Sequence, residues 1–349
     1  MSPDRFDVLD RLAPLFEAPE PSFERFVRRR DRKRRNQRIA AAVVGIAVFV
    51  AAVWLTTGGP FDRARVPTVP GGGHAGTPSM APETATGAFL LDLATGETTP
   101  LPEGLAEGTT YVASPDGARL AYARQRYVPG GSVEIANLDG TDVRTIEPSE
   151  GRAISDGARW SPDGTMLVYQ ESAGIGALGS LFVHDLASGD RTKLTDLQPA
   201  SGYWFWISAS FSPDGRQVIF HLPRSSSAIT KWDAWSVPVT GGEPTLVLRN
   251  ATFPLYLPDG ERIAFLVPAP SSFGERIAIV SADGSGPRRT LVDAGGEIWW
   301  PAISPDGTRI AYAVDGSIHV VDVSTGITSE VAEGRQADWL DDDTLVVSP

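Results

Sequence analysis

The sequence of 349 residues contains no cysteine and only four histidines. Without cysteine the chain can form no disulfide, no cysteine-ligated zinc site and no thiol nucleophile. The histidines His74, His184, His221 and His319 occur singly and show neither an HExxH motif nor another metal-ligand spacing. The sequence therefore predicts no metal site and no cofactor.

Motifs of hydrolytic enzymes are also missing. No G-x-S-x-G stretch marks a serine nucleophile on a sharp strand-to-helix turn. Carboxylates are numerous, but nothing groups a nucleophile with a base and an orienting residue, and Asp341–Asp343 is expected to form a degenerate turn. We therefore expect a protein that is not an enzyme and that has no catalytic residue.

The net charge of −12 is unevenly distributed along the chain. Residues 1–65 hold 13 of the 31 Lys and Arg but only 8 of the 43 Asp and Glu, so the remainder carries 18 basic and 35 acidic residues. The basic cluster near the N-terminus and the acidic remainder of the chain therefore need separate explanations.

An apolar run of membrane-spanning length follows the basic cluster. Residues 39–57 (IAAAVVGIAVFVAAVWLTT) hold 19 residues without a charge, and as a helix they extend roughly 28 Å, the thickness of a bilayer core. Nine of the residues in 25–38 are basic, which predicts a cytoplasmic N-terminus and a single-pass plasma-membrane protein with everything after Thr57 on the extracytoplasmic side. A cleaved signal peptide is the alternative, but no clean A-x-A site follows the run.

The segments on either side of the span have different compositions. Residues 1–38 combine short amphipathic stretches around Phe6 and Phe23 with the basic cluster, which is typical of a segment that lies on the membrane or docks a cytoplasmic partner. Topology and anionic lipid explain the basic residues more simply than nucleic acid does. Residues 58–86 are rich in Gly, Pro and Thr and are expected to form a linker.

An internal repeat occupies residues 87–349. Its prolines, at positions 115, 162, 213, 258 and 305, are spaced 47, 51, 45 and 47 residues apart, about the size of one four-stranded propeller blade. The five copies are ASPDGARLAYA from Ala113, WSPDGTMLVYQ from Trp160, FSPDGRQVIFH from Phe211, YLPDGERIAFL from Tyr256 and ISPDGTRIAYA from Ile303.

Each copy predicts a strand, a tight turn and a second strand. Proline fixes φ in the turn, aspartate bonds to the turn backbone and glycine supplies a positive φ. The alternating run that follows, such as TMLVYQ, is typical of a strand with one buried face. A further hairpin, such as SLFVHDLASGDRTKLT (residues 180–195), gives each blade four strands.

The two ends of the repeat region complement each other. DWLDDDTLVVSP (residues 338–349) matches only the first strand pair of a blade, and GAFLLDLATGETTPL (residues 87–101) matches only the second. We therefore expect an all-β, six-bladed β-propeller that is closed by N- and C-terminal strands sharing one blade and preceded by a single transmembrane α-helix.

These repeats resemble those of TolB-like, WD-repeat-like six-bladed propellers, which carry the same aromatic-Ser-Pro-Asp-Gly signature. The resemblance covers residues 87–349 and implies the fold, but propellers of this kind host binding, scaffolding and catalysis alike. The chain departs from TolB itself, because it lacks the small N-terminal mixed domain and has an apolar span instead. The partners of TolB are therefore not carried over.

The connections after the second and fourth strands are predicted to form the binding surface. They are long and varied, whereas those after the first and third strands are short and stereotyped. The run Tyr203, Trp204, Phe205 and Trp206 cannot point entirely inward from one strand, and Trp232 is a possible neighbour. These aromatics either offer a stacking or anchoring surface or pack between blades.

Two functional hypotheses follow from this organisation. The first is a membrane-tethered extracytoplasmic propeller that acts as a non-catalytic binding or scaffolding module for an envelope protein or glycan. The second is a transmembrane signalling regulator of anti-sigma-like layout, with the propeller as sensor and residues 1–38 acting on a cytoplasmic regulator. No nucleic-acid partner is expected.

Overall fold

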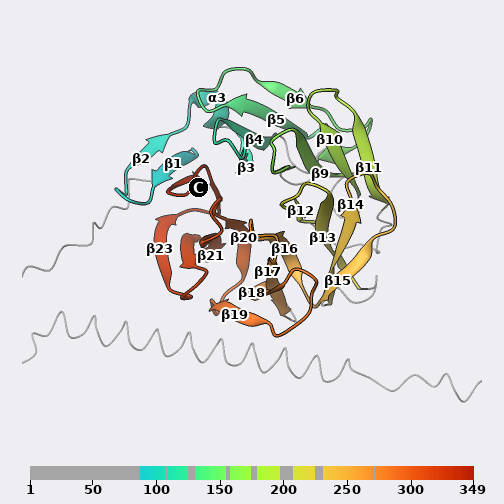
Figure 1. Ribbon diagram of the computed structural model, residues 1–349. Helices are drawn as coiled ribbons and strands as arrows, with labels where there is room; N and C mark the ends of the chain where they lie inside the picture. The colour runs from blue at the N-terminus through green and yellow to red at the C-terminus, as the bar shows by residue number, and fades with distance from the viewer. Residues whose placement is uncertain are drawn as a thin grey trace, which may run out of the picture. The chain divides into compact units, whose positions relative to one another are not determined.

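Six antiparallel sheets are arranged as the blades of a ring (Figure 1). The computed structural model describes residues 87–106, 108–124, 130–154, 158–173, 179–196, 207–224, 231–269 and 272–349. Within these residues the prediction of an all-β, six-bladed propeller is confirmed. The predicted segments 1–38, 39–57 and 58–86 lie outside the described residues.

The blades are named A to F in ring order, with their strands given from the innermost outward. Blade A contains β24 (Gln336–Trp339), β25 (Thr344–Ser348), β1 (Phe89–Asp92) and β2 (Thr98–Pro100). Blade B contains β3 (Thr109–Ala113), β4 (Arg119–Arg124), β5 (Ser132–Asn137) and β6 (Arg144–Ile146). In blade C both β7 (Ala153–Ile154) and β8 (Arg159–Trp160) pair with β9 (Met166–Ser172), so the innermost strand is in two pieces.

Blades C to F complete the ring. Blade C contains β7 (Ala153–Ile154), β8 (Arg159–Trp160), β9 (Met166–Ser172), β10 (Ser180–Asp185) and β11 (Arg191–Asp196). Blade D contains β12 (Ala209–Phe211), β13 (Gln217–Pro223), β14 (Trp232–Pro238) and β15 (Thr245–Arg249). Blade E contains β16 (Thr252–Tyr256), β17 (Arg262–Ala269), β18 (Ser272–Ser281) and β19 (Arg289–Asp293). Blade F contains β20 (Ile298–Ile303), β21 (Arg309–Val314), β22 (Ser317–Asp322) and β23 (Thr328–Glu333).

Blade A is built from both ends of the repeat region, as the sequence predicted. β1 pairs with β25 in an antiparallel ladder in which Phe89 lies opposite Val347 and Asp92 lies opposite Thr344. The hairpin β24–β25 comes from the C-terminal end and the hairpin β1–β2 from the N-terminal end. The ladder leaves neither hairpin with an open edge at the seam.

The Ser-Pro-Asp-Gly turns share one hydrogen-bond pattern. In blade B the Ser114 hydroxyl donates to Asp116 Oδ1 at 2.5 Å, and the Gly117 amide donates to the Ser114 carbonyl at 2.8 Å. Blades C, D and F repeat both bonds with Ser161, Ser212 and Ser304. The serine hydrogen bond is the main cause of a lowered pKa at Asp116, Asp163 and Asp214.

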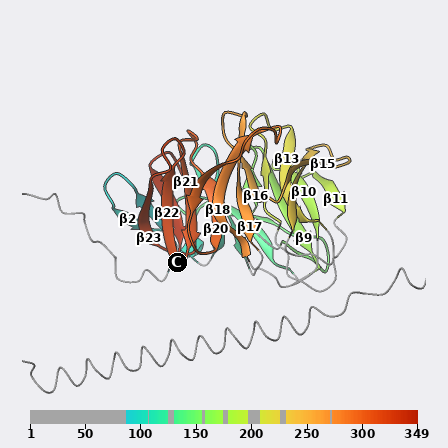
Figure 2. The ribbon, with the colours of Figure 1, turned by 90° about the horizontal axis from the view of Figure 1, so that it is seen from below.

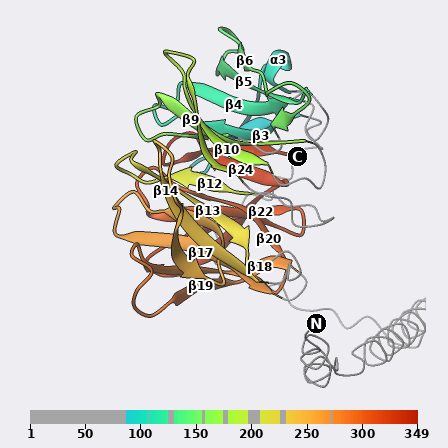
Figure 3. The same cartoon turned by 90° about the vertical axis from the view of Figure 1, so that its right-hand side faces the viewer.

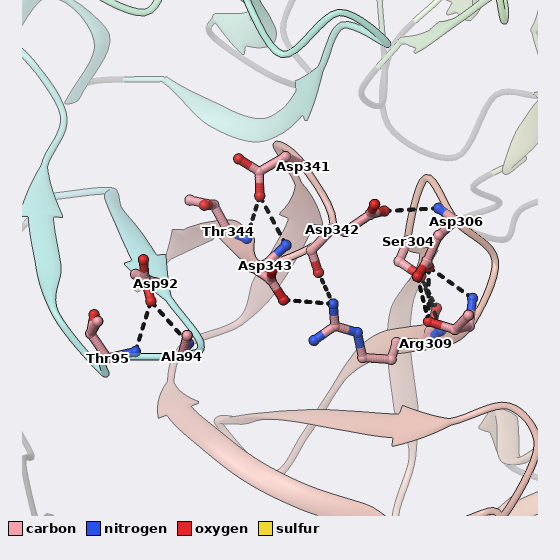
Figure 4. A network of polar contacts seen from close by, with 11 residues as sticks. Asp92, Ala94, Thr95, Ser304, Asp306, Arg309, Asp341, Asp342, Asp343 and Thr344 are labelled. Atoms are coloured by element: carbon pink, nitrogen blue, oxygen red, sulfur yellow. Dashed lines mark hydrogen bonds and ion pairs between the residues drawn. The ribbon is translucent and has the colours of Figure 1, made fainter.

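Two blades depart from this pattern and replace the serine contact. In blade E, Leu257 stands in the serine position, and Asp259 bonds instead to the Glu261 amide and to Arg262 Nε at 2.7 Å. At the seam the expected degenerate turn is present, with Asp341 Oδ1 accepting the amides of Asp343 and Thr344 at 2.9 and 2.7 Å (Figure 4).

The hydrophobic core is divided among the six interfaces between neighbouring blades. Each interface holds one cluster of buried side chains that come from both blades. In the cluster between blades C and D, for example, Leu181 and Val183 pack with Phe211 and Phe220. Because a sheet buries each face only against its neighbours, no blade has a core of its own.

Tryptophans on two innermost strands donate hydrogen bonds across the interface to the neighbouring blade. Trp160 Nε1 donates to the Val112 carbonyl of blade B at 3.1 Å, and the Arg119 guanidinium lies 4.7 Å from the centre of the Trp160 ring. Trp339 and Arg309 repeat the arrangement between blades A and F, with the Ala302 carbonyl as acceptor at 3.0 Å. Among the aromatic residues that precede the turns, Trp160, Phe211 and Trp339 are buried, whereas Tyr256 is only partly buried.

The ring has two dissimilar faces, which Figure 2 shows from the side. The face that carries the connections after the first and third strands of each blade is called the turn face. The other, the loop face, carries those after the second and fourth strands. Blade F contributes a two-residue turn to the loop face, with Asp315 and Gly316 both at positive φ. The longest connections on the loop face, of six to twelve residues, belong to blades A to D.

A single short helix joins blade A to blade B at the rim. The helix α3 (Glu103–Ala106) lies beside β5 and β6 (Figure 3). Its Leu105 is completely buried, and the Tyr111 hydroxyl of β3 donates to the carbonyls of Leu105 and Gly108. Burial raises the pKa of Tyr111 to about 12, so the phenol stays protonated as a donor.

We predict that Gly307→Ala destabilises the ring more than Gly189→Ala. Both glycines have φ near +75°, where alanine costs roughly 1–2 kcal/mol. A Cβ at Gly307 would also lie 2.9 Å from Pro258 Cδ in the neighbouring blade, whereas nothing lies within 4 Å at Gly189. Overpacking of this kind adds roughly 1–3 kcal/mol. Urea unfolding of both variants measures the difference, and equal losses would show that the contact between the turns is unimportant.

We further predict that Asp322→Asn flattens the loss of stability in acid. The side chain accepts hydrogen bonds from the amides and hydroxyls of Ser324 and Thr325, and the Ser324 hydroxyl contributes most to lowering the pKa from 3.8 to about 2. Because the folded-state pKa is the lower one, this stabilisation is present above about pH 4 and is lost as the pH falls toward 2. Unfolding free energies at pH 7 and pH 3 test this. Ile327→Ala, which removes an exposed side chain without a titratable group, is the control and should leave the acid slope unchanged.

Candidate functional site

The predicted aromatic site is only partly within the described residues. Tyr203, Trp204, Phe205 and Trp206 lie outside them, and their role as binding residues remains a prediction. Trp232, at the start of β14, is 3% exposed and packs edge-on against the His221 ring, with 5.3 Å between the ring centres. Of the two interpretations left open for these aromatics, Trp232 follows the second, because its ring is buried in the packing of the blades.

A row of aromatic rings runs from Trp232 toward the ring axis. The His221 ring lies 5.2 Å from that of Phe253 in blade E, and the Phe253 ring lies 6.0 Å from that of Trp300 in blade F. The row therefore crosses three blades at their loop-face ends. Such edge-to-face and tilted pairs add specific geometry to the area they bury. The row forms a rigid base beneath the loops of blade D.

Histidine 221 holds this row together by a hydrogen bond between blades. Its Nδ1 accepts the Phe253 amide at 3.2 Å, and the side chain is completely buried. The bond supports an unusual backbone, because Phe253 has φ of +47°, which a bulky residue adopts only where the surroundings impose it. His221 therefore contacts the next blade through both its ring and its hydrogen bond.

Blade C contains an equivalent hydrogen bond from its second strand to the start of the next blade. Gln170 occupies the position of His221 relative to the turn, nine residues after the serine. Its Oε1 accepts the amide of Ile207, the residue that follows Trp206, at 3.2 Å. A polar side chain on the second strand thus holds the start of the next innermost strand in both blades, which fixes the ends of the loops.

A buried carboxylate anchors the connection between β13 and β14. Asp233 has a side chain only 2% exposed, and Arg224 donates to its two oxygens at 2.9 and 2.6 Å. The Asn250 amide donates to it at 3.0 Å. Burial alone would raise the pKa of Asp233, but the hydrogen bonds from Arg224 and Asn250 hold it below its ordinary value. The aspartate therefore stays charged and fixes both ends of the connection.

The described residues contain no group of three or more His, Asp or Glu side chains that could hold a metal ion. Every described buried carboxylate has a partner: Glu171 pairs with Arg191 at 2.7 Å, and Asp338 lies beside Arg159. In the same residues no helix is long and apolar enough to cross a membrane. The predicted span at 39–57 lies outside them.

Comparison with known proteins supports the fold. No protein-family model matches the chain. A structure described as a putative TolB from Agrobacterium tumefaciens matches 75% of this chain and 96% of its own, with 17% identity and a TM-score of 0.58. The chain has the TolB-type propeller fold. TolB from Acinetobacter baumannii matches 75% of this chain and 63% of its own, with 16% identity and a TM-score of 0.50.

The TolB-type fold does not by itself decide whether the protein is an enzyme. The hydrazine synthase of Kuenenia stuttgartiensis, an enzyme by its description, matches 75% of this chain and 86% of its own, with 15% identity and a TM-score of 0.50. At such identities the likeness concerns the arrangement of blades, and function depends on the side chains placed on them.

We predict that His221→Leu destabilises the propeller by about 1–3 kcal/mol, because it leaves the buried Phe253 amide without its acceptor. His221→Gln should lose less, since Gln170 performs the same role in blade C. Thermal unfolding of the two variants tests this order. If leucine were tolerated as well as glutamine, the hydrogen bond would contribute nothing to the loop-face base.

Proposed function

We propose that the chain is a non-catalytic binding module whose loop face engages an envelope protein, with an envelope glycan as the alternative ligand. The observation that carries this proposal is the difference between the two faces. After the first strand of a blade the turn face repeats one short turn, whereas the loop-face connections range from two to twelve residues and differ from one another. Specificity is usually built on such irregular loops above a rigid scaffold.

The buried contacts beneath the loop face support this role. Gln170, His221 and Asp233 each fix the end of a connection from below. A surface held in this way loses little conformational entropy when a partner binds. The predicted aromatics Tyr203, Trp204, Phe205 and Trp206 belong to one of these connections and would supply the apolar anchors.

The proposal includes a membrane tether. Residues 39–57 would span the plasma membrane once, with residues 1–38 in the cytoplasm, residues 58–86 as linker and the propeller on the extracytoplasmic side. Alternatively, the chain is a signalling regulator in which the propeller senses and residues 1–38 act on a cytoplasmic regulator. The amphipathic stretches before the basic cluster favour that alternative.

In-cell crosslinking and affinity capture of the full-length chain test the proposal. We expect Trp204→Ala with Trp206→Ala to abolish capture of an envelope partner, because truncation of central aromatic anchors costs 2 kcal/mol or more, roughly thirtyfold in affinity. Ile327→Ala is the matched control, since this side chain is 69% exposed on the turn face and should leave capture unchanged.

A second variant separates the two hypotheses. Deletion of residues 2–24 spares the basic cluster and the apolar run. Under the binding-module proposal it leaves the envelope partner captured. Capture of a cytoplasmic protein that is lost with this deletion, while the aromatic change has no effect, would instead establish the signalling alternative.

A further inference from the structure

The row of aromatic rings beneath the loop face is buried except at its axis end. Trp232 is 3% exposed, His221 is completely buried and Phe253 is 1% exposed. Trp300, on the innermost strand of blade F, is only partly buried. Its ring meets that of Phe253 edge-on at 82°, with 6.0 Å between the centres, so a neighbouring ring fixes its orientation. The row therefore ends in a tryptophan that solvent reaches and whose position is already set.

Trp299 is a second partly exposed tryptophan at the same place. It pairs with Ala313, one row from the pair of Ile298 and Val314 that ends this ladder at the loop face. Trp299 packs against the cluster between blades A and F, whereas Trp300 packs against the cluster between blades E and F. The two indoles therefore lie on opposite sides of the innermost strand of blade F.

Two adjacent tryptophans are unusual at this position of the repeat. Counted back from the turn, the equivalent pairs of the other blades hold at most one large apolar residue: Thr109 and Thr110, Asp156 and Gly157, Ile207 and Ser208, Thr252 and Phe253, and Arg335 and Gln336. Of these, Thr109 and Arg335 are exposed, so solvent reaches this end of the ring axis. The packing of the blades thus does not require two indoles here.

The connections nearest to these tryptophans are short. Residues 294–297, 315–316 and 334–335 join the strands around them on the loop face. A Cβ on Gly296 would lie 3.0 Å from Asp315 Oδ2, so the first two connections pack closely together. Blade F itself therefore puts no long connection over its tryptophans.

Two carboxylates flank the pair. Glu297 stands two residues before Trp299, and Asp315 stands two residues after Ala313, which lies opposite Trp299 in the ladder. At about 3.3 Å per residue, both carboxylates lie roughly 7 Å along the strands from the level of Trp299. Arg335 is the only basic residue in the three connections. The indoles are thus bordered mainly by negative charge.

These surroundings favour a cation as the ligand. Residues 87–349 carry 34 acidic and 18 basic residues, so an anionic group would be repelled. The face of an indole attracts a cation more strongly than any other aromatic side chain does, and nearby carboxylates add to that attraction. Arginine fits best, because its planar and weakly hydrated guanidinium also stacks on aromatic faces.

We propose that Trp299 and Trp300 form a cation-binding surface at the loop-face end of the ring axis, which takes an arginine side chain of the protein partner. This inference rests on the proposed function, since the same partner would occupy the loop face. It names the chemistry of the group that the partner presents there.

Fluorine NMR of the full-length chain in neutral detergent, labelled with 5-fluorotryptophan, tests the inference. Trp299→Phe and Trp300→Phe each identify one of the nine tryptophan signals by its loss. The probe is a capped glycine-arginine-glycine peptide, and the reference is the same peptide with citrulline, which has the shape of arginine without its charge. At constant ionic strength, we expect both signals to shift saturably and the arginine peptide to bind about tenfold more tightly.

Asp315→Asn should weaken binding of the arginine peptide about two- to threefold, because it removes one nearby negative charge. Asparagine tolerates the φ of +51° at this exposed position, so the variant keeps the fold. Asp190→Asn is the matched control, because it removes the same charge from an exposed residue of the turn face and should leave binding unchanged.

Signals of Trp299 and Trp300 that respond to neither peptide, or equally to both, would overturn the inference. A saturable shift with methyl glucoside but not with the arginine peptide would also overturn it, in favour of the glycan alternative. The proposed function survives either result if Trp204→Ala with Trp206→Ala still abolishes capture of an envelope protein. Conversely, binding of the arginine peptide by a chain that captures no partner would refute the proposed function and leave the cation site intact.

Discussion

The ladder between β1 and β25 is the interaction on which the rest of the structure depends. It pairs residues that are 252 to 258 positions apart in the chain and so creates blade A. Blade A supplies half of two hydrophobic clusters, one shared with blade B and one with blade F. Since no blade has a core of its own, loss of this ladder would expose both of those clusters as well as two strand edges.

The parts of the fold that could be predicted from sequence are those set by local chemistry. Proline, aspartate and glycine at fixed positions determine the turn, and the spacing of the turns gives the size and number of the blades. Closure of the ring could be predicted because the two incomplete ends carry complementary halves of one repeat. Even the seam turn, Asp341–Asp343, keeps the role of an aspartate that caps two amides, although serine, proline and glycine are all absent there.

The contacts between blades could not be predicted in this way. His221 and Phe253 are 32 residues apart, and Asp338 and Ala113 are 225 apart, so no local pattern connects them. The positive φ of Thr110, Phe253 and Trp300, each four residues before the serine or its equivalent, also has no signature in the residue types. The burial of Trp232 could not be predicted either, because a residue beside a long connection in the sequence can point into the core, as this one does.

The departures from the repeat are concentrated in one sector of the ring. Blades A to D carry the longer loop-face connections, whereas those of blades E and F have two to four residues, and the Arg159–Asp338 ion pair lies against β3 of blade B. Arg159 and Asp338 each stand two residues before the first-strand turn of their blade, so this ion pair lies at the turn-face end of the innermost strands and away from the loop-face connections. The variety of the loop face therefore does not depend on that ion pair, and the contacts that fix its ends are those of Gln170, His221 and Asp233.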